Sequence, residues 1–176
     1  MDSYGQPIFL FGMPRSGTTW IGKIFDSHPR TLYRHEPDSW SPVPAVPLAP
    51  RLEDAPRYAD HMKRFVASIA SMTVPKVCAK TPIFKKDYQT SAAFQLQKMG
   101  VMTAKLGGRL SPGFPVFGTT SRVSENVRLV WKSIESLARL GVFLDCFPNA
   151  RAIHIVRHPC GYVSSVLRGE QRSHFE

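Results

Sequence analysis

Short apolar runs alternate with amphipathic stretches along this chain, and this alternation predicts an α/β fold. Four runs are compact enough for buried strands, at residues 8–11, 31–34, 128–132 and 152–156. A fifth run, at residues 74–79, also predicts a strand. Helical patterns lie between the runs, so strands and helices are expected to follow one another along the chain.

The clearest helical pattern places apolar residues at the spacing of one helix face. These residues are Tyr58, Met62, Phe65, Val66 and Ile69. Their spacing of three and four positions predicts an amphipathic helix that packs on the core. A helix is also expected over residues 17–26, ended by His28-Pro29, and residues 84–105 are weakly helical.

Three further helix faces can be proposed from the positions of apolar residues. In the helix over residues 17–26, Trp20, Ile21, Ile24 and Phe25 form the expected buried stripe. Ser133 is expected to cap the N-terminus of the next helix, whose buried face would be Ile134, Leu137, Ala138, Gly141 and Leu144. The last helix opens at Pro159, and Val163, Val166 and Leu167 are expected to pack inward.

Two stretches have the composition of loops. Residues 37–56 contain six prolines, which argue against both a helix and a central strand there. A loop of this length inside a compact domain is usually functional or mobile, so it is expected to be a lid facing a site or an inert connector. Residues 106–121 are rich in glycine and proline and predict a second loop.

Composition and charge narrow the class of protein. The 176 residues are 43% hydrophobic and 20% charged, which are values of a single globular domain with a real core. A net charge of +10 suits a polyanionic partner such as nucleic acid, membrane headgroups or a multiply phosphorylated small molecule. Because the basic residues form no tail or long run, neither nucleic acid nor a membrane is the expected partner.

Cysteine usage and hydropathy point to a cytoplasmic protein without a structural metal. Cys78, Cys146 and Cys160 lie far apart and show no spacing of a zinc site or a disulfide framework. Reduced thiols are therefore expected. The N-terminus shows no signal peptide, and no apolar run is long enough to cross a membrane.

The strongest chemical signal lies between the first strand and the first helix. A strand, a glycine turn and a helix N-terminus form a phosphate cradle, because the first N–H groups of a helix have no intrahelical partner. The spacing Gly12-x4-Gly17 matches the nucleotide-binding P-loop, but Thr18-Thr19 stand where that motif requires Lys-Ser/Thr. The cation is Arg15, inside the turn. This pattern argues against an ATPase or kinase and for a nucleotide with another transferable group.

Two motifs resemble those of sulfotransferases that use 3′-phosphoadenosine-5′-phosphosulfate (PAPS). Pro14-Arg15-Ser16-Gly17-Thr18-Thr19-Trp20 resembles their 5′-phosphosulfate loop. Val156-Arg157-His158-Pro159, followed by Ser165, resembles their 3′-phosphate motif, with Ser164 as the alternative if the register shifts by one residue. An arginine fork suits a phosphate better than the point charge of lysine.

The resemblance implies a P-loop NTPase-like parallel β-sheet flanked by helices, and a site whose residues can be named. It assigns the cofactor to Arg15, Ser16, Gly17, Thr18, Thr19, Trp20, Arg157 and Ser165. In His35-Glu36-Pro37, Glu36 is the candidate base and His35 its competitor; Lys80 or Lys132 would assist the leaving group. The implied reaction moves the sulfuryl group of PAPS to a hydroxyl or amine of a small-molecule or saccharide acceptor. It leaves 3′-phosphoadenosine 5′-phosphate and needs no metal.

The sequence also departs from this family's pattern. The histidine of a Lys-Thr-His motif is not evident, although Trp131-Lys132-Ser133 occupies a comparable strand end. Family members usually continue well beyond the second motif, so residues 1–176 are expected to form one C-terminally incomplete domain. A nucleotide kinase or NTPase with a variant loop, which would need Mg²⁺, remains an alternative. A non-catalytic nucleotide- or nucleic-acid-binding module is another, and acceptor identity and oligomeric state stay open.

Overall fold

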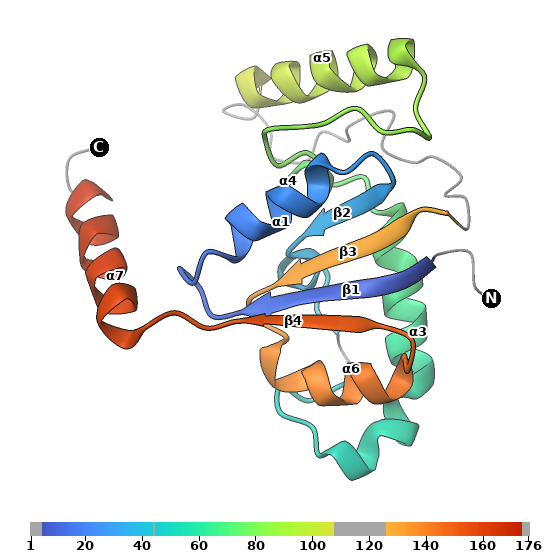
Figure 1. The fold of residues 1–176 in the computed structure, drawn as a ribbon, viewed down its shortest axis with the longest axis vertical. Helices are drawn as coiled ribbons and strands as arrows, with labels where there is room; N and C mark the ends of the chain where they lie inside the picture. Colours follow the sequence, from blue (N-terminus) through green and yellow to red (C-terminus); the bar gives the residue numbers. More distant parts are fainter. Residues whose placement is uncertain (1–4, 44, 108–125, 174–176) are drawn as a thin grey trace.

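The computed structural model describes residues 5–43, 45–107 and 126–173 and is built on one parallel β-sheet (Figure 1). The strands are β1 (Gly5–Gly12), β2 (Thr31–His35), β3 (Arg128–Ser133) and β4 (Arg151–Ile155), in the spatial order β2-β3-β1-β4. All three strand pairings are parallel. The predicted α/β class is therefore confirmed, with a parallel β-sheet flanked by helices.

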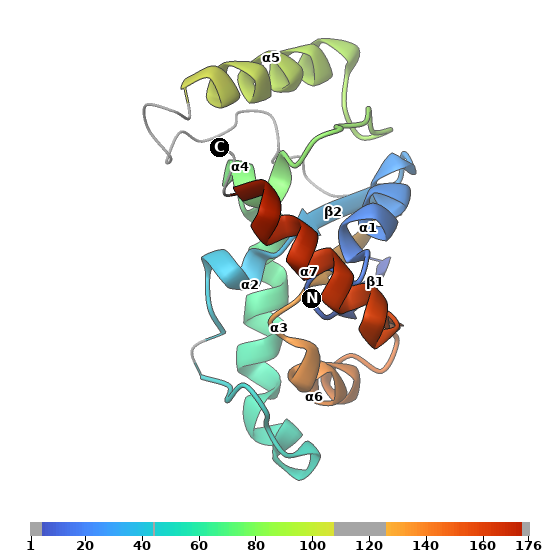
Figure 2. The ribbon, with the colours of Figure 1, turned by 90° about the vertical axis from the view of Figure 1, so that its left-hand side faces the viewer.

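Helices lie on both faces of the sheet. They are α1 (Thr18–Ser27), α2 (Pro37–Trp40), α3 (Ala55–Ser71), α4 (Pro75–Cys78), α5 (Ser91–Gly107), α6 (Leu140–Cys146) and α7 (Pro159–Ser173), with single 3₁₀ turns at Leu52–Asp54 and Leu137–Arg139. In Figure 1, α1 lies across one face, and α3 and α6 lie across the other. Helix α7 leaves the β4 edge and projects from the body, and Figure 2 shows it crossing in front of the strand ends.

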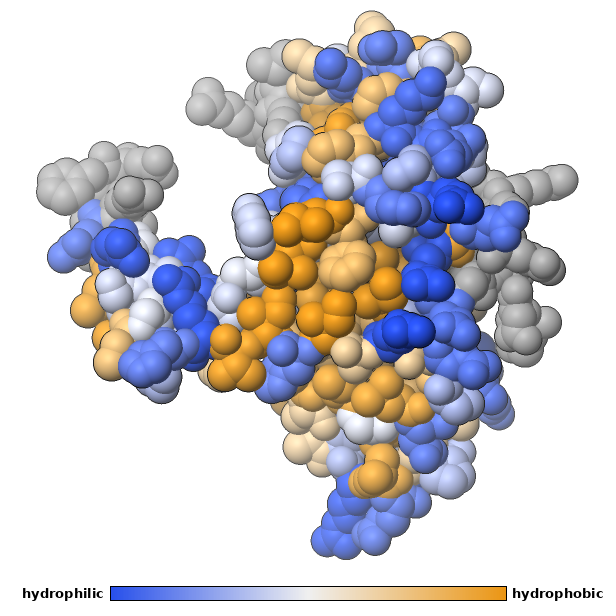
Figure 3. Space-filling view, in the orientation of Figure 1, coloured by the Kyte–Doolittle hydropathy of each residue, from blue (hydrophilic) through white to orange (hydrophobic). Residues whose placement is uncertain are grey.

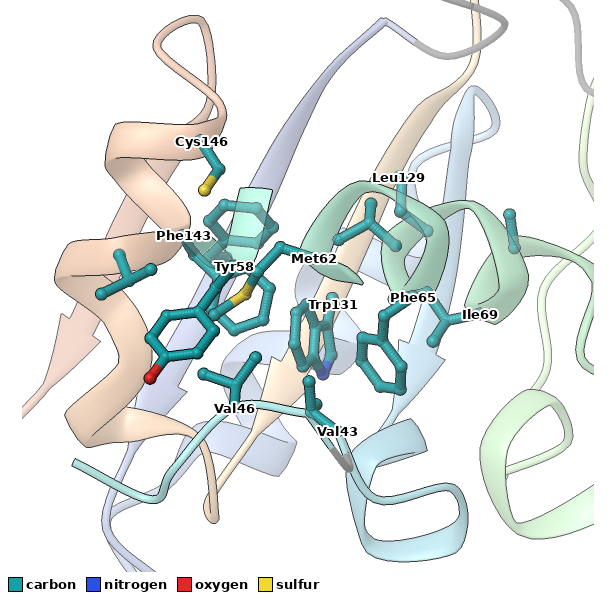
Figure 4. Packing of buried hydrophobic residues seen from close by; sticks show 14 of the residues in the cluster. Val43, Val46, Tyr58, Met62, Phe65, Ile69, Leu129, Trp131, Phe143 and Cys146 are labelled. Carbon is teal, nitrogen blue, oxygen red and sulfur yellow. The ribbon is translucent and has the colours of Figure 1, made fainter. Parts of the chain in front are cut away.

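The main core lies between the sheet and the helices α3 and α6 (Figure 4). Successive side chains of a strand point to opposite faces, so Phe9 and Phe11 of β1 and Trp131 of β3 all enter this core. Phe143 of α6 meets the Trp131 ring edge-on, with 4.8 Å between ring centroids. Aromatic pairs in this geometry stabilise beyond the area they bury, by about 0.5–1.5 kcal/mol each.

A smaller core lies under α1 on the opposite face. Ile8, Tyr33 and Val130 are buried there, with Phe25 of α1 packed against them. Gly22 makes this packing possible, because a Cβ at its position would lie 2.5 Å from the Tyr33 hydroxyl oxygen. The helix therefore approaches the sheet through a glycine.

This contact explains why the predicted stripe on α1 is only half right: Ile21 and Phe25 are half-buried, but Trp20 and Ile24 are not. The buried residues of α1 are Thr18, Gly22 and Asp26, whereas Trp20 is 70% exposed and Ile24 is 51% exposed. Asp26 is buried because Lys23 and Lys86 form ion pairs with its carboxylate, at 2.7 and 3.0 Å. The face of α1 that points into the protein interior therefore carries a glycine and an ion-paired carboxylate.

The predicted strand over residues 74–79 is also wrong, because Pro75–Cys78 form the single turn of α4. Proline fits the first turn of a helix, where its missing N–H is not needed. The N–H groups of Val77 and Cys78 donate to the carbonyl of Val74, so local bonds satisfy this backbone without a neighbouring strand. The sequence pattern was ambiguous because short apolar runs fit both structures.

The prediction that prolines exclude helix from residues 37–56 is wrong at its start. Pro37 opens the short helix α2, again in the first turn. The following segment is anchored to the body: Val43 and Val46 are buried, and Arg139 donates to the carbonyl oxygens of Val46 and Pro47 at 2.8 Å each. None of the described residues of this segment lines the cleft described below, so the structure gives no support to a lid.

The predicted helix after Ser133 exists but begins later, and its predicted buried face is only partly right, because Leu137 and Leu144 pack against the main core. The Ser133 hydroxyl accepts hydrogen bonds from the N–H groups of Glu135 and Ser136, as an N-cap side chain does. Ser133 itself ends β3, however, and the first helical turn begins only at Leu137. The buried residues of α6 are Val142, Phe143 and Cys146, whereas Ala138 and Gly141 are exposed.

The C-terminal helix is placed differently from the prediction. Val163 and Leu167 of α7 are about half exposed, because the helix projects from the β4 edge instead of covering the sheet. The predicted helix α3 is confirmed, and the weakly helical stretch at 84–105 is confirmed in part, because α5 begins only at Ser91. Most of the predicted loop at 106–121 lies outside the described residues. Among the helices that are described, none combines the length and the apolar character needed to span a membrane.

Candidate active site

The carboxyl ends of parallel strands meet at one edge of the sheet, and a cleft of about 1040 Å³ opens there. Its lining residues are Pro14, Arg15, Gly17, Thr18, Thr19, Trp20, Lys23, Ile24, Ser27, His35, Glu36, Lys80, Pro82, Phe84, Lys132, Ile134, Arg157 and Ser165. All the predicted site residues except Ser16 are in this set. Ser16 lies within the loop beneath the cleft, and the alternative Ser164 does not line it.

The turn between β1 and α1 has the backbone of a tight anion-binding loop. Arg15 has φ 63° and Gly17 has φ 100°, both in the left-handed region. Gly12 is equally constrained, since a Cβ there would lie 2.7 Å from the Ile155 carbonyl oxygen and 2.9 Å from Ser16 Oγ. Ser16 Oγ is buried without a hydrogen-bond partner among the described residues. Most buried polar side-chain atoms in proteins have a hydrogen-bond partner, so this hydroxyl is an exception.

The two predicted motifs meet at this loop. An Arg157 Nη1 donates to the carbonyl oxygen of Arg15 at 2.7 Å, and Arg15 Nη2 donates to the carbonyl oxygen of Ser165 at 2.8 Å. The sheet explains the meeting, because β1 and β4 are paired in parallel with Gly12 opposite Ile155. Arg15 and Arg157 follow these strand ends by two or three residues and therefore emerge side by side.

Glu36 occupies a strained position at the end of β2. Its φ of 47° places a non-glycine residue in the left-handed region, and Arg15 is the other such residue among those described. Conformations of this kind cost about 1–3 kcal/mol each and concentrate at functional sites. The Glu36 N–H donates to the carbonyl oxygen of Lys132 at 2.8 Å, and Lys132 Nζ binds Glu36 Oε1. Parallel pairing of His35 with Lys132 brings these groups together.

His35 contacts the same carboxylate from the other side. Its Nε2 lies 3.9 Å from Glu36 Oε1, and its Nδ1 lies 2.9 Å from the Tyr33 hydroxyl oxygen. Burial, followed by the charge of Lys132, lowers the pKa of His35 to about 4, although Glu36 opposes the shift. Burial raises the pKa of Tyr33, so its hydroxyl keeps its proton. Near neutral pH both groups are therefore uncharged.

Two lysines of the cleft are held in different ways. Lys132 is almost completely buried, and this burial lowers its pKa although Glu36 favours the charged form. Lys80 is exposed at the cleft surface. It lies there because Lys23 of α1 donates to the carbonyl oxygens of Lys80 and Pro82, fixing the segment after α4 against α1. Lys80 thus reaches the cleft although no strand precedes it.

Sequence reasoning missed the residues that support this site. Lys23, Asp26 and Tyr33 carry no motif, and only the packing of α1 on β2 shows their roles. Asp38 was also missed: its carboxylate accepts hydrogen bonds from the Ser133 and Ser136 hydroxyls and fixes α2 beside the end of β3. A buried acid directly after Glu36-Pro37 was the available signal.

The charge of the cleft favours an anionic ligand. Arg15, Lys23, Lys80, Lys132 and Arg157 line it, and Glu36 is the carboxylate among its lining residues. No group of three or more His, Cys, Asp or Glu side chains within the described parts of the chain could hold a metal ion. Strand-end arginines beside the first turn of a helix are instead the chemistry of a phosphate or sulfate site.

Comparison with known proteins gives a family. Searches of curated proteins and of solved structures found no match. A family model described as "Sulfotransferase family" matches residues 7–176, which include both motifs and the whole sheet except the first two residues of β1. Because this match covers nearly the whole chain, the protein belongs to the sulfotransferase family.

Proposed function

We propose that this protein transfers the sulfuryl group of PAPS to a hydroxyl or amine of an acceptor bound in the cleft. One observation carries the proposal: the cleft brings the residues of the 5′-phosphosulfate loop and of the 3′-phosphate motif into direct contact. Two arginines, Arg15 and Arg157, lie on one cleft large enough for a nucleotide, and they suit a ligand with two anionic groups.

The residues present fit such a ligand. The first N–H groups of α1, the unpaired Ser16 hydroxyl and the guanidinium of Arg15 would hold the 5′-phosphosulfate, together with Thr18 and Thr19. Arg157 and Ser165 would hold the 3′-phosphate, and Trp20 offers an exposed ring to the adenine. PAPS, when bound, supplies an activated sulfuryl group on a phosphate leaving group.

Glu36 is the proposed general base. Lys132 and His35 both contact its Oε1, and Oε2 has no hydrogen bond within the described residues, so Oε2 can accept the acceptor's proton. His35 is the weaker candidate, because its low pKa and its Tyr33 contact disfavour proton uptake. In the transfer, the acceptor oxygen forms a bond to sulfur and the bond from sulfur to the phosphate oxygen breaks. The electron pair stays on that oxygen, and the proton goes to Glu36.

The cations would stabilise charge that develops on the leaving oxygen. Lys80 is exposed at the cleft and can approach this oxygen, whereas Lys132 is fixed by its ion pair with Glu36. Lys132 therefore acts on the orientation of the base, and Lys80 is the better candidate for the leaving group. Preorganised charge of this kind is usually the largest contribution to catalysis in group transfer.

A thermal-shift comparison of nucleotides tests the proposal. 3′-Phosphoadenosine 5′-phosphate at a hundred times its dissociation constant should stabilise the protein by about 2.7 kcal/mol. For a chain of this size the expected rise in Tm is roughly 5–10 °C. AMP and ATP should give much smaller shifts, and Arg157→Ala should remove the difference. Equal shifts for all three nucleotides, or turnover of ATP with Mg²⁺, would contradict a site built for a 3′-phosphate.

A further inference from the structure

Apolar side chains line the cleft beside its cationic groups. Ile24 of α1 is 51% exposed and faces the same cleft as Pro82 and Phe84. These three residues form an apolar wall. Figure 3 shows that apolar side chains gather over the face of the molecule that carries α1. Exposed apolar groups inside a cleft mark a binding surface more reliably than single ones elsewhere.

The apolar wall is held in place by buried charge. The Lys23 ammonium donates to the Asp26 carboxylate and to the carbonyl oxygens of Lys80 and Pro82. Lys86, two residues after Phe84, forms a second ion pair with Asp26 at 3.0 Å. Both sides of the wall are thus fixed to one buried carboxylate. These contacts fix the two segments that carry the wall, so its apolar side chains can stay exposed in the cleft.

The position of the wall separates it from the proposed nucleotide groups. Trp20 lies in the first turn of α1, next to the phosphate loop, and Ile24 lies four residues later. At 1.5 Å per residue, Ile24 is about 6 Å farther along the helix axis from that loop. Pro82 and Phe84 follow Lys80, the residue placed at the reacting group. The wall therefore lies in the same cleft as Glu36 and Lys80, one helical turn farther from the phosphate loop than Trp20.

We propose that the acceptor is an amphiphilic alcohol, with an alkyl or aryl body on the apolar wall and its hydroxyl beside Glu36. This inference rests on the proposed sulfuryl transfer, because only that reaction requires an acceptor. The bonding changes are those given above, with the acceptor oxygen as nucleophile. Each CH₂ group that leaves water for the wall raises affinity by at most about fourfold. The wall thereby selects acceptors by their apolar body.

A homologous series of ligands tests the acceptor class by binding alone. Methyl, butyl and hexyl β-D-glucoside share one polar head and differ only in the alkyl body. We expect calorimetric dissociation constants to fall from the methyl to the hexyl compound by between tenfold and about a thousandfold, with 3′-phosphoadenosine 5′-phosphate present at saturation. Ile24→Asn should weaken hexyl glucoside at least fivefold and leave methyl glucoside unchanged.

Leu96→Asn is the matched control, because Leu96 on α5 is similarly exposed and does not line the cleft. It should bind the whole series like the wild type. Equal affinities along the series would overturn the inference, as would an Ile24→Asn variant that keeps the chain-length dependence. If 3′-phosphoadenosine 5′-phosphate abolished the binding of hexyl glucoside, the adenine would occupy the apolar wall. That result would also overturn the inference. The shift in Tm caused by 3′-phosphoadenosine 5′-phosphate tests nucleotide binding, and therefore tests the proposed function independently of the acceptor.

Discussion

Trp131 and Lys132 are neighbours in β3 and are both buried, yet they serve opposite sides of the molecule. Trp131 enters the aromatic core under α3 and α6, where its ring contacts four phenylalanines and its indole N–H donates to Asp38. Lys132 enters the region of the cleft, where it binds Glu36. Alternation along one strand thus separates the residues that stabilise the fold from those that act on a ligand.

The two regions also differ in backbone strain and in exposure. In the aromatic core, rings of four elements pack edge to face or tilted and are almost completely buried. At the cleft, Arg15 and Glu36 hold left-handed conformations, and Arg15 donates to the Ser165 carbonyl oxygen of the projecting helix α7. The core supplies free energy that offsets the strain of the cleft.

The largest expected effect tests the cleft. Glu36→Gln removes the proposed base and keeps a group that can accept from Lys132, so transfer from PAPS should fall by about 10²–10⁴-fold. Binding of 3′-phosphoadenosine 5′-phosphate should stay within a few-fold of wild type. Glu135→Gln is the control, since Glu135 is exposed and lies outside the cleft. If the Glu36→Gln variant stayed active, the general base would have to be another residue.

The second prediction tests the core. Trp131→Ala leaves a cavity among Phe9, Phe65 and Phe143 and should lower the free energy of unfolding by about 3–5 kcal/mol. Urea denaturation measures the loss. Trp40→Ala, on the surface helix α2, should cost less than about 1 kcal/mol. If both variants lost the same amount, the aromatic cluster would not be the main source of stability.

The third prediction concerns the junction of the two regions. Gly12→Ala places a Cβ against the Ile155 carbonyl and Ser16 Oγ, so the phosphate loop must move. Nucleotide affinity, measured by calorimetry, should fall at least tenfold, with a loss of stability of about 1–3 kcal/mol. Gly100→Ala is the control, because a Cβ there meets nothing within 4 Å. Unchanged affinity in Gly12→Ala would show that the loop tolerates the displacement.

The smallest effect is a pH dependence from His35. Its pKa falls from 6.5 in the unfolded chain to about 4 in the folded protein, so the unfolded state binds more protons between these values. His35 therefore contributes stability that is complete above pH 6.5 and is lost as the pH falls toward 4, by at most about 1.4 kcal/mol per pH unit.

Urea denaturation at several pH values checks this contribution. His35→Gln should flatten the stability profile between pH 4 and 6.5, whereas His61→Gln, at an exposed position of α3, should leave it as in the wild type. A His35→Gln profile with the wild-type slope would show that other groups carry the acid sensitivity.

The sequence by itself determined the four strands of the sheet and the long helix α3, and it located the two motifs, although it also predicted a strand at residues 74–79 that is not there. Short apolar runs and a regular apolar spacing depend on local pattern, and Gly12, Gly17 and Pro159 mark conformations that few other residues adopt. These signals are local, so they can be read without knowing which segments meet. The resemblance of the motifs then gave the family.

Only the tertiary structure decided which groups share the cleft and which helix faces are buried. Parallel pairing of β1 with β4 brings Arg15 to Arg157, and pairing of β2 with β3 brings Glu36 to Lys132. These residues are far apart in the sequence, so no local pattern predicts that they meet. The exposed face of α1 follows from Gly22 packing on Tyr33 and from the ion pairs of Asp26. Burial depends on what a neighbouring element offers, and an apolar pattern describes only one of the two surfaces that meet.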